Sequence, residues 1–309
     1  MGVALLVMAG CVTQPPEPQR LKVMAWNIEA QGLNQECFDS LVGIVKASGA
    51  DVLLVVETYG RHEQLMKALG WYGCACSYSD SMSMYSRYPI VKYEEPYTPE
   101  AKPYLFGGFK AIWGTAVAEL DVNGRRVRVC PTSLSFWPDV DRISEGPEAA
   151  LEHELQPSPY GSRRIDQVRN IIKALEPYAA EADRIPLILG GDFNSLSHLD
   201  WTPETANYFD HAGQVIAWPV SKALADAGYV DTYRAINPCA LTAPGISYMF
   251  DRWAREVRQI RLDYIYAKGA ARPVASEMFN ARYHKPTTFR GKTFTYPSDH
   301  GFVLTTFEL

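Results

Sequence analysis

The chain lacks a hydrophobic run long enough to span a membrane, a Ser/Gly-rich linker and an internal repeat. The apolar stretch over residues 3–11 is too short to cross a bilayer, because a spanning helix needs about 20 apolar residues. With no linker or long charge run, the 309 residues offer no boundary for a division, and 47% hydrophobic residues suffice for a sizeable core. We therefore expect one domain over residues 21–309, preceded by a short leader over residues 1–20.

Clusters of Lys and Arg are also missing. Directly adjacent basic residues occur only as pairs, such as Arg125-Arg126 and Arg163-Arg164, and the net charge is −5 with a pI near 5.7. Proteins that hold duplex nucleic acid through its phosphates usually present a basic surface. Nucleic acid is therefore not the favoured partner, although a local basic groove on an acidic protein is the alternative.

The six cysteines do not indicate a disulfide framework. Apart from Cys11 in the leader, five remain, and an odd number cannot form a complete set of pairs. Cys74 and Cys76 are too close in sequence for an easy mutual bridge. Cys130 and Cys239 have apolar neighbours and are expected in the core.

The leader ends in small residues and a cysteine, a pattern that resembles the end of a bacterial lipoprotein signal. In that interpretation Cys11 is lipidated, and residues 13–20, with three prolines, form a flexible tether to the membrane. The basic segment that opens a signal peptide is missing, so a plain N-terminal tail is the alternative. The first interpretation predicts a lipid-anchored, periplasmic or extracellular protein of the bacterial cell envelope, and the second predicts a cytoplasmic protein.

One apolar run ends in residues that suit chemistry. Residues 185–189 read Ile-Pro-Leu-Ile-Leu, and two glycines, Asp192, Phe193 and Asn194 follow. A buried strand that stops there brings a carboxylate and an amide to the edge of a sheet, where ligand sites commonly lie. A simple turn after the strand is the alternative, because Gly-Asp is also a turn sequence.

The same pattern occurs at four other places, which a purely structural role explains poorly. The further segments are 21–28 with Asn27, 51–58 with Glu57, 261–266 with Asp263, and 296–300 with Asp299 and His300. A single carboxylate at the end of a buried strand is usually a satisfied hydrogen-bond acceptor. Five such ends with carboxylates, amides and a histidine indicate a shared site instead.

In this order the motifs resemble the endonuclease/exonuclease/phosphatase superfamily, which includes DNase I-like nucleases, abasic-site endonucleases, inositol-polyphosphate 5-phosphatases and bacterial sphingomyelinases. The motifs are Trp26-Asn27, Glu57, Gly191-Asp192-Phe193-Asn194, Arg261-Leu262-Asp263-Tyr264 and Ser298-Asp299-His300. The resemblance covers residues 21–309 and implies metal-dependent phosphoester chemistry. It does not name the substrate, since one scaffold serves many functions.

The resemblance also implies a four-layered α/β sandwich of two mainly antiparallel mixed β-sheets flanked by helices. Local patterns agree with it. Apolar residues recur at helical spacing over 38–45 and 165–175. Residues 117–128 are typical of a hairpin around Asn123-Gly124, and residues 82–87 and 89–93 are typical of strands.

The chemistry of phosphoesters favours a metal at the strand ends. Phosphoester oxygens are already negative, and a hard divalent cation with oxygen ligands neutralises that charge. Asn27 and Glu57 suit Mg²⁺, with Mn²⁺ as the substitute, and the resemblance adds Asp299 to the metal region.

Four residues are expected to act on water and phosphate. We expect Asp192 to align and deprotonate the attacking water, and Asn194 to donate to a phosphate oxygen. His300 is expected against the phosphate, and Asp263 is expected to bind its other ring nitrogen and raise its pKa. A salt bridge between Asp263 and Arg261 is the structural alternative, and for Asp299-His300 it is a turn before the last strand.

One position departs from the family pattern. Many relatives carry a histidine where this chain has Ser133, and a serine hydroxyl cannot act as a general acid at neutral pH. Tyr160 and His198 are candidate replacements near the substrate, although a histidine that only pins a loop is equally typical. Arg164 is a candidate phosphate contact, with a solvated helix-face arginine as the alternative.

Long loops over residues 97–108, 135–162 and 196–221 are rich in Pro, Trp and Tyr and are expected to ring the site. With the acidic balance and the membrane tether, Trp137, Trp201 and Trp218 favour a small-molecule, sugar-phosphate or lipid-headgroup phosphoester as substrate. We therefore expect a monomeric, Mg²⁺-dependent phosphodiesterase or phosphatase. The alternatives are a nuclease acting on DNA or RNA and an inactive binding protein of the same fold.

Overall fold

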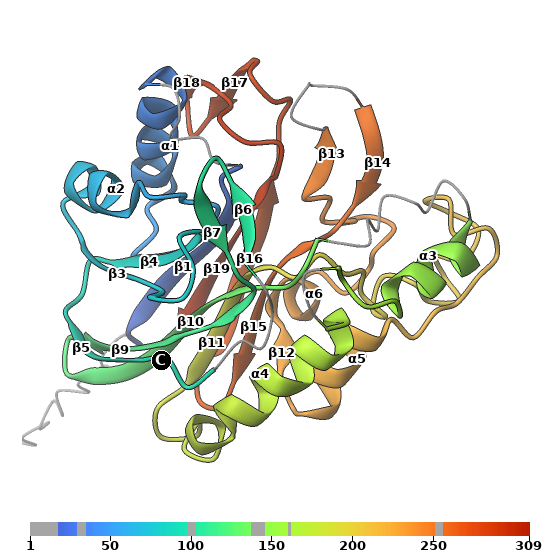
Figure 1. Ribbon diagram of the computed structural model, residues 1–309, viewed down its shortest axis with the longest axis horizontal. Helices are drawn as coiled ribbons and strands as arrows, with labels where there is room; N and C mark the ends of the chain where they lie inside the picture. Colours follow the sequence, from blue (N-terminus) through green and yellow to red (C-terminus); the bar gives the residue numbers. More distant parts are fainter. Residues whose placement is uncertain (1–17, 30–34, 98–102, 137–145, 160–161, 251–255) are drawn as a thin grey trace, which may run out of the picture.

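A computed structural model of the protein describes residues 18–29, 35–97, 103–136, 146–159, 162–250 and 256–309. Two large sheets face each other, and helices cover their outer faces (Figure 1). In each sheet one strand pair is parallel and the others are antiparallel. The predicted four-layered α/β sandwich is therefore confirmed.

The first sheet has six strands, and its central pair β1 and β2 is parallel. In spatial order the strands are β16 (Arg272–Phe279), β19 (Phe302–Glu308), β1 (Arg20–Asn27), β2 (Val52–Val56), β4 (Met82–Ser86) and β3 (Tyr72–Ala75). Its outer face carries α1 (Gln35–Ser48) and α2 (His62–Leu69).

The second sheet has seven strands, and its parallel pair is β10 and β11. In spatial order the strands are β12 (Val230–Asp231), β15 (Asp263–Lys268), β11 (Leu187–Asp192), β10 (Arg125–Ser133), β9 (Val117–Val122) and β5 (Ile90–Glu94), with β8 (Gly114–Thr115) beside β10. Its outer face carries α4 (Arg164–Ala179) and α5 (Pro219–Asp226). The predicted hairpin around Asn123-Gly124 is confirmed.

Smaller elements surround the sandwich. They are the helices α3 (Pro147–Glu154) and α6 (Thr232–Ile236) and the two-stranded sheets β6 (Tyr104–Phe106) with β7 (Phe109–Ala111), β13 (Tyr248–Phe250) with β14 (Glu256–Ile260), and β17 (Pro286–Phe289) with β18 (Lys292–Thr295). Among the described residues, no helix is long and apolar enough to cross a membrane.

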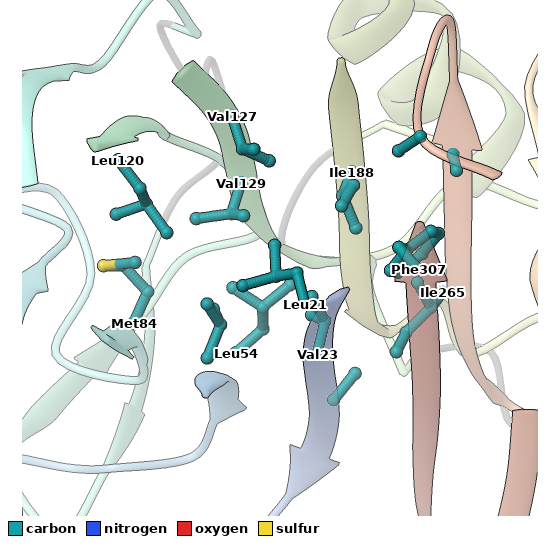
Figure 2. Close-up of a cluster of buried hydrophobic side chains, with 14 of the residues drawn as sticks. Leu21, Val23, Leu54, Met84, Leu120, Val127, Val129, Ile188, Ile265 and Phe307 are labelled. Atoms are coloured by element: carbon teal, nitrogen blue, oxygen red, sulfur yellow. The ribbon is translucent and has the colours of Figure 1, made fainter. Parts of the chain in front are cut away.

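The core lies between the two sheets because side chains alternate along each strand. In β1, Val23 faces the second sheet, whereas Met24 and Trp26 face the helices. Figure 2 shows Leu21, Val23 and Leu54 of the first sheet opposite residues of the second, which are Leu120, Val127, Val129 and Ile188. Both faces of the central strands are thereby buried, which explains their nearly continuous apolar sequences.

Two glycines bring the sheets together next to Asp192. A Cβ on Gly190 would lie 2.8 Å from Leu54 and 3.0 Å from Ala25, both in the other sheet. Gly191 has φ +150°, and a Cβ there would lie 1.9 Å from the carbonyl oxygen of Thr132. Only glycine fits at these positions, so the Gly-Gly pair places Asp192 close to the ends of the first sheet.

The five described cysteines are free thiols. Cys130 is fully buried, as expected. The expected core position of Cys239 is wrong, because its side chain is exposed in the segment after α6. Cys11 lies outside the described residues, so its lipidation stays a prediction.

Candidate active site

The polar residues predicted from the strand ends gather at one shared edge of the two sheets. β1, β2, β10 and β11 run toward this edge, and the antiparallel β15 and β19 start from it. Asp192 is paired in register with Ser133 on one side and with Asp263 on the other. The strand ends of both sheets thus place side chains from across the chain next to each other.

Asn27 connects the two sheets at this edge. Its Nδ2 donates to Glu57 Oε1 at 3.2 Å and to Asp192 Oδ2 at 3.0 Å. Its Oδ1 accepts from the backbone N–H of Glu29 at 2.9 Å, which fixes the orientation of the amide. The neutral amide therefore holds two carboxylates from different sheets at one point.

Asp192 is held from its C-terminal side by Asn194, which has φ +48°. The Asn194 backbone N–H donates to Asp192 Oδ1 at 2.8 Å, and Nδ2 donates to Oδ2 at 3.0 Å and to the Leu134 carbonyl at 3.1 Å. Both amide protons of Asn194 are used within the protein. The expected donation from Asn194 to a phosphate oxygen is corrected: the side chain positions Asp192.

His300 forms the expected pair with Asp263, and Nδ1 lies 2.9 Å from Oδ2. The Asp263 backbone N–H donates to Ser247 Oγ, and the His300 backbone N–H donates to Ser298 Oγ. Because Asp263 engages Nδ1, Nε2 is the ring nitrogen left to face a substrate. Tyr248 packs against the imidazole with ring centroids 4.9 Å apart.

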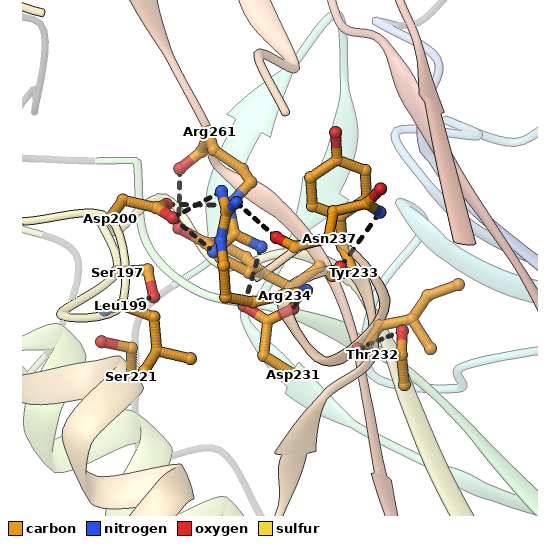
Figure 3. A network of polar contacts seen from close by, with 12 residues as sticks. Ser197, Leu199, Asp200, Ser221, Asp231, Thr232, Tyr233, Arg234, Asn237 and Arg261 are labelled. Carbon is orange, nitrogen blue, oxygen red and sulfur yellow. Dashed lines mark hydrogen bonds and ion pairs between the residues drawn. The ribbon is translucent and has the colours of Figure 1, made fainter. Parts of the chain in front are cut away.

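The alternative salt bridge between Arg261 and Asp263 is wrong. Arg261 donates to Asp200 through Nε at 2.8 Å and Nη2 at 3.1 Å, and Nη1 lies 2.7 Å from Asp231 Oδ2. Arg234 reaches the same Asp200 at 2.7 Å, so the four charges form a buried network (Figure 3). Because Arg261 pairs with Asp200 and Asp231, Asp263 is available to pair with His300.

Burial and mutual repulsion raise the pKa values of the carboxyl groups. Burial and Glu29 raise the pKa of Glu57 to about 7, against the opposing effects of His300 and Asn27. Burial and Asp263 raise the pKa of Asp192 to about 6. Burial, with Glu29 and Glu57, also holds the pKa of Asp299 well above its usual value.

For the imidazole of His300, burial and the neighbouring carboxylates shift the pKa in opposite directions. Burial favours its neutral form, but the Asp263, Asp192 and Asp299 carboxylates outweigh burial and raise the pKa of His300 well above its usual value. A protonated imidazole beside a phosphate would be a strong hydrogen-bond donor to its oxygens.

The predicted metal region fits a divalent cation. Asp299 Oδ1 is buried and has no hydrogen-bond partner among the described residues. It belongs to a group of carboxylates, with Glu57 and Glu29, whose mutual repulsion a cation would relieve. Oxygen ligands of this kind suit Mg²⁺.

A second group of potential ligand atoms lies beside the first. Single ligand atoms of Asp192, Asp263 and His300 lie within 4.8 Å of one another. The imidazole Nδ1 of this group already pairs with Asp263. For a hard cation we therefore favour the oxygen-only group of Glu57, Asp299 and Asn27.

The structure corrects the assignment of Arg164. Its side chain is fully buried, Nη1 donates to Glu154 Oε2 at 2.8 Å, and Nε donates to the Ser135 carbonyl at 2.8 Å. Ser195 Oγ donates to the other Glu154 oxygen at 2.7 Å. With no exposed surface, Arg164 is neither a phosphate contact nor a solvated helix-face arginine. It joins the segments that follow Ser133 and Asn194.

His198 takes the loop-pinning role that was its alternative. Its backbone nitrogen and its Nδ1 each lie 2.8 Å from Ser221 Oγ in α5. Burial lowers the pKa of His198, so the ring is a poor proton donor at neutral pH. Tyr160 lies outside the described residues and stays a candidate by prediction.

The tryptophans of the loop over residues 196–221 do not ring the site as expected. Trp201 and Trp218 are buried and contact each other with ring centroids 5.3 Å apart. Trp201 also stacks on His211 at 3.8 Å. These rings form a small core of their own and cannot shape substrate choice directly. Trp137 lies outside the described residues.

Sequence reasoning missed Glu29, Ser247 and Tyr248, and it gave Ser298 no role beyond its place in the Ser298-Asp299-His300 motif. Glu29 orients Asn27, Ser298 Oγ donates to the Asn27 carbonyl at 2.7 Å, Ser247 supports Asp263, and Tyr248 contacts His300. Glu29 lies two residues after Asn27, so only proximity in sequence could have indicated it. No pattern marks Ser247 or Tyr248, which the β13–β14 segment brings in.

Comparisons with known proteins identify the class to which this fold and site belong. A family model described as the Endonuclease/Exonuclease/phosphatase family matches residues 24–300. The chain belongs to this family, whose members hydrolyse phosphoester bonds and are generally dependent on divalent metals. The superfamily predicted from the strand-end motifs is therefore confirmed.

An uncharacterised protein of Caenorhabditis elegans is 31% identical over 188 residues, which span 55% of this chain and 59% of that relative. Three solved structures share the fold over 93–94% of the chain. They are a family protein from Leptotrichia buccalis (14% identity, all of its chain, TM-score 0.58), D. rerio TDP2 complexed with a single-strand DNA product (15%, 99%, 0.55), and the human Nocturnin catalytic domain with bound sulfate (18%, 94%, 0.53). At these identities the likeness concerns the fold.

Proposed function

We propose that this protein is a Mg²⁺-dependent hydrolase that cleaves a small-molecule, sugar-phosphate or lipid-headgroup phosphoester with an activated water. The observation that carries the proposal is that the side-chain amide of Asn27 donates to both Glu57 and Asp192. Glu57 could bind a cation while Asp192, on the other side of the amide, could accept a proton from water. Family membership supports the hydrolysis of a phosphoester bond.

Glu57, Asp299 and Asn27 would hold the cation. When bound, Mg²⁺ supplies charge neutralisation at the phosphoryl oxygens. Glu57 and Asp299 must lose their protons to bind it, and the cation lowers the pKa values that burial and Glu29 raise. Asp299 Oδ1 is buried and has no hydrogen-bond partner among the described residues, and such an ion would satisfy it.

Asp192 and His300 would act on either side of the phosphate. Asn194 and Asn27 fix the carboxylate of Asp192, so it can accept a proton from an aligned water without reorganising. Asp263 orients His300, whose Nε2 would donate to a phosphoryl oxygen as negative charge develops. Ser133, beside Asp192 in register, can donate a hydrogen bond but not a catalytic proton.

The nuclease alternative has one specific observation in its favour. A structural neighbour, D. rerio TDP2, is complexed with a single-strand DNA product. The absence of Lys/Arg clusters and the net charge of −5 favour a small substrate instead. An inactive binding protein is disfavoured, because the hydrogen bonds that hold Asp192 and His300 are all formed.

A turnover screen tests the proposal. Phosphomonoesters, phosphodiesters, phospholipids and single-stranded DNA are incubated with the protein in Mg²⁺ or in EDTA. Asp192→Asn is the matched control, since it keeps the shape of the side chain. We expect turnover of a small phosphoester that requires Mg²⁺ and Asp192. Turnover of DNA alone would select the nuclease, and Mg²⁺-independent turnover would overturn the proposal.

The location and oligomeric state remain proposals from the sequence. We propose a monomer that is attached to the bacterial envelope through lipidated Cys11. A Cys11→Ser variant expressed in a bacterium should move from the membrane fraction to the soluble fraction. If wild type and variant fractionate alike, the lipid anchor is wrong and the plain-tail alternative stands.

A further inference from the structure

An aromatic hairpin borders one side of the candidate site. The chain leaves β2 at Glu57 and turns through Tyr59 and Gly60, which both have positive φ values. The ring of Phe109 in β7 packs directly on Gly60, where an added Cβ would lie 2.4 Å from that ring. Tyr59 and Phe109 are also neighbours, with ring centroids 6.4 Å apart. Hairpin β6–β7 thus packs against the residues that follow Glu57.

Hydrogen bonds anchor the hairpin at the same place. The backbone N–H of Lys110 donates to Asp80 Oδ2 at 2.6 Å, and the backbone N–H of Asp80 donates to the Lys110 carbonyl at 2.7 Å. Thr58 Oγ1 donates to the Asp80 carbonyl at 3.2 Å. Asp80 therefore connects the segment that follows Glu57 with the return strand of the hairpin.

The other side of the hairpin reaches the second sheet. Tyr104 in β6 contacts Phe136 edge to face, with centroids 5.3 Å apart, and the buried Trp113 contacts Phe136 at 6.1 Å. Phe136 lies three residues after Ser133, within about 10 Å along the chain. The hairpin therefore joins the strand ends of both sheets, and Figure 1 shows it rising at the same end of the sheets as β13–β14 and β17–β18.

We propose that Tyr104, Phe109 and Phe136 form an aromatic wall that binds a planar aromatic ring carried by the phosphoester substrate. All three side chains are partly exposed, whereas Tyr59 and Trp113 beneath them are buried supports. Ring pairs gain stacking or edge-to-face contacts beyond plain apolar burial. This inference rests on the proposed function and narrows its substrate to small molecules with a ring close to the phosphate.

The hairpin offers a matched control. In register, Tyr104 pairs with Ala111 and Leu105 pairs with Lys110, so Leu105 lies on the opposite face from Tyr104 and Phe109. The side chain of Leu105 is 62% exposed, and like the side chain of Phe109 it is apolar. A change at Leu105 tests for general loss of apolar surface without touching the wall.

The experiment compares the binding of benzylphosphonate and cyclohexylmethylphosphonate to the full chain in Mg²⁺ by calorimetry. Both carry one phosphonate and the same number of carbons, but only the first ring is planar and aromatic. We expect the wild type to bind benzylphosphonate about three- to tenfold more tightly. Phe109→Leu and Phe136→Leu should reduce the ratio to about one, and Leu105→Ala should keep the wild-type ratio.

The outcomes separate this inference from the proposed function. If neither phosphonate binds with Mg²⁺, the phosphoester site itself is wrong. If both bind equally to the wild type, or if cyclohexylmethylphosphonate binds more tightly, the aromatic wall is overturned while the site stands. Circular dichroism checks that each variant is folded, and the wild-type ratio decides the question if a variant does not fold.

Discussion

Asn27 of the first sheet donates to Asp192 of the second sheet at 3.0 Å, and the same amide nitrogen donates to Glu57 at 3.2 Å. This contact connects the two sheets and joins the proposed metal ligands to the carboxylate that we propose as the proton acceptor. Gly190 makes it geometrically accessible, because any side chain there would collide with Leu54 and Ala25. The geometry of the candidate site therefore depends on close packing of the sandwich at this end.

Metal dependence should rest mainly on Glu57. Glu57→Gln removes a charged oxygen ligand, so we expect Mg²⁺ affinity, measured by calorimetry, to fall by more than about tenfold. Asn27→Ala removes only a neutral ligand and should lower affinity less. EDTA should abolish turnover, and Mg²⁺ or Mn²⁺ should restore it. Full turnover by metal-free protein would refute the assignment.

The stability of the metal-free protein should depend on pH through Glu57. Its pKa is about 7 in the folded protein against a usual value of 4.5, so its stabilising contribution is complete below about pH 4.5 and is lost as pH rises through about 7. The shift corresponds to about 3 kcal/mol.

In EDTA, the melting temperature should therefore fall as the pH rises from about 4.5 to about 7. The fall should be less steep in Glu57→Gln than in the wild type. Mg²⁺ binds the ionised carboxylate, so the rise in melting temperature that it causes should be larger at about pH 8 than at about pH 5. Identical pH profiles for the two proteins would contradict the role of Glu57.

Asp192→Asn should remove the proton acceptor and keep the fold. We expect a loss on the order of 10² to 10⁴ in kcat, the range for loss of a general base. Calorimetry with Mg²⁺ serves as the control, because the variant should still bind the cation. A folded variant with nearly full activity would show that another group activates the water.

The serine at position 133 should make the rate depend steeply on the leaving group. An aryl oxide departs without a proton, whereas an alkoxide does not, so aryl phosphoesters should be cleaved much faster than alkyl ones. Ser133→His should narrow that gap, and His198→Ala should leave it unchanged because His198 is bound to Ser221.

The measurement is kcat/KM against leaving-group pKa for these variants and for Tyr160→Phe. A selective loss of alkyl substrates in Tyr160→Phe would identify Tyr160 as the proton donor. A flat series in every protein would mean that no side chain of this set protonates the leaving group.

Arg164 and its neighbour Arg163 should respond differently to truncation. Arg164→Ala leaves the buried Glu154 without its charged partner, which should cost about 3–5 kcal/mol of unfolding free energy. Arg163→Ala breaks only an exposed pair with Asp166 and should cost much less, because solvent screens that pair. Denaturant unfolding measures both. If Arg164→Ala instead keeps its stability and shows a raised KM, Arg164 contacts the substrate phosphate after all, and its structural assignment is wrong.

The sequence by itself determined the fold and the main positions of the site. Buried strands of a sandwich are continuously apolar, and the polar residues Asn27, Glu57, Asp192 and Asp263 interrupt that pattern where the strands end or begin. Such local contrasts are readable because strand length and side-chain alternation are properties of short segments. The order of the motifs then sufficed to indicate the superfamily.

Only the tertiary structure decided which groups pair with which. From the sequence, Arg261 could have paired with Asp263, and Arg164 could have contacted phosphate or solvent. In the structure both are buried, where Arg261 pairs with Asp200 and Arg164 pairs with Glu154. Ser247 and Tyr248 join the cluster through contacts with Asp263 and His300, which lie far from them in the sequence. Partners brought together by packing leave no periodic pattern in the chain, because the free energy of a buried ion pair or ring contact depends on geometry that distant segments create together.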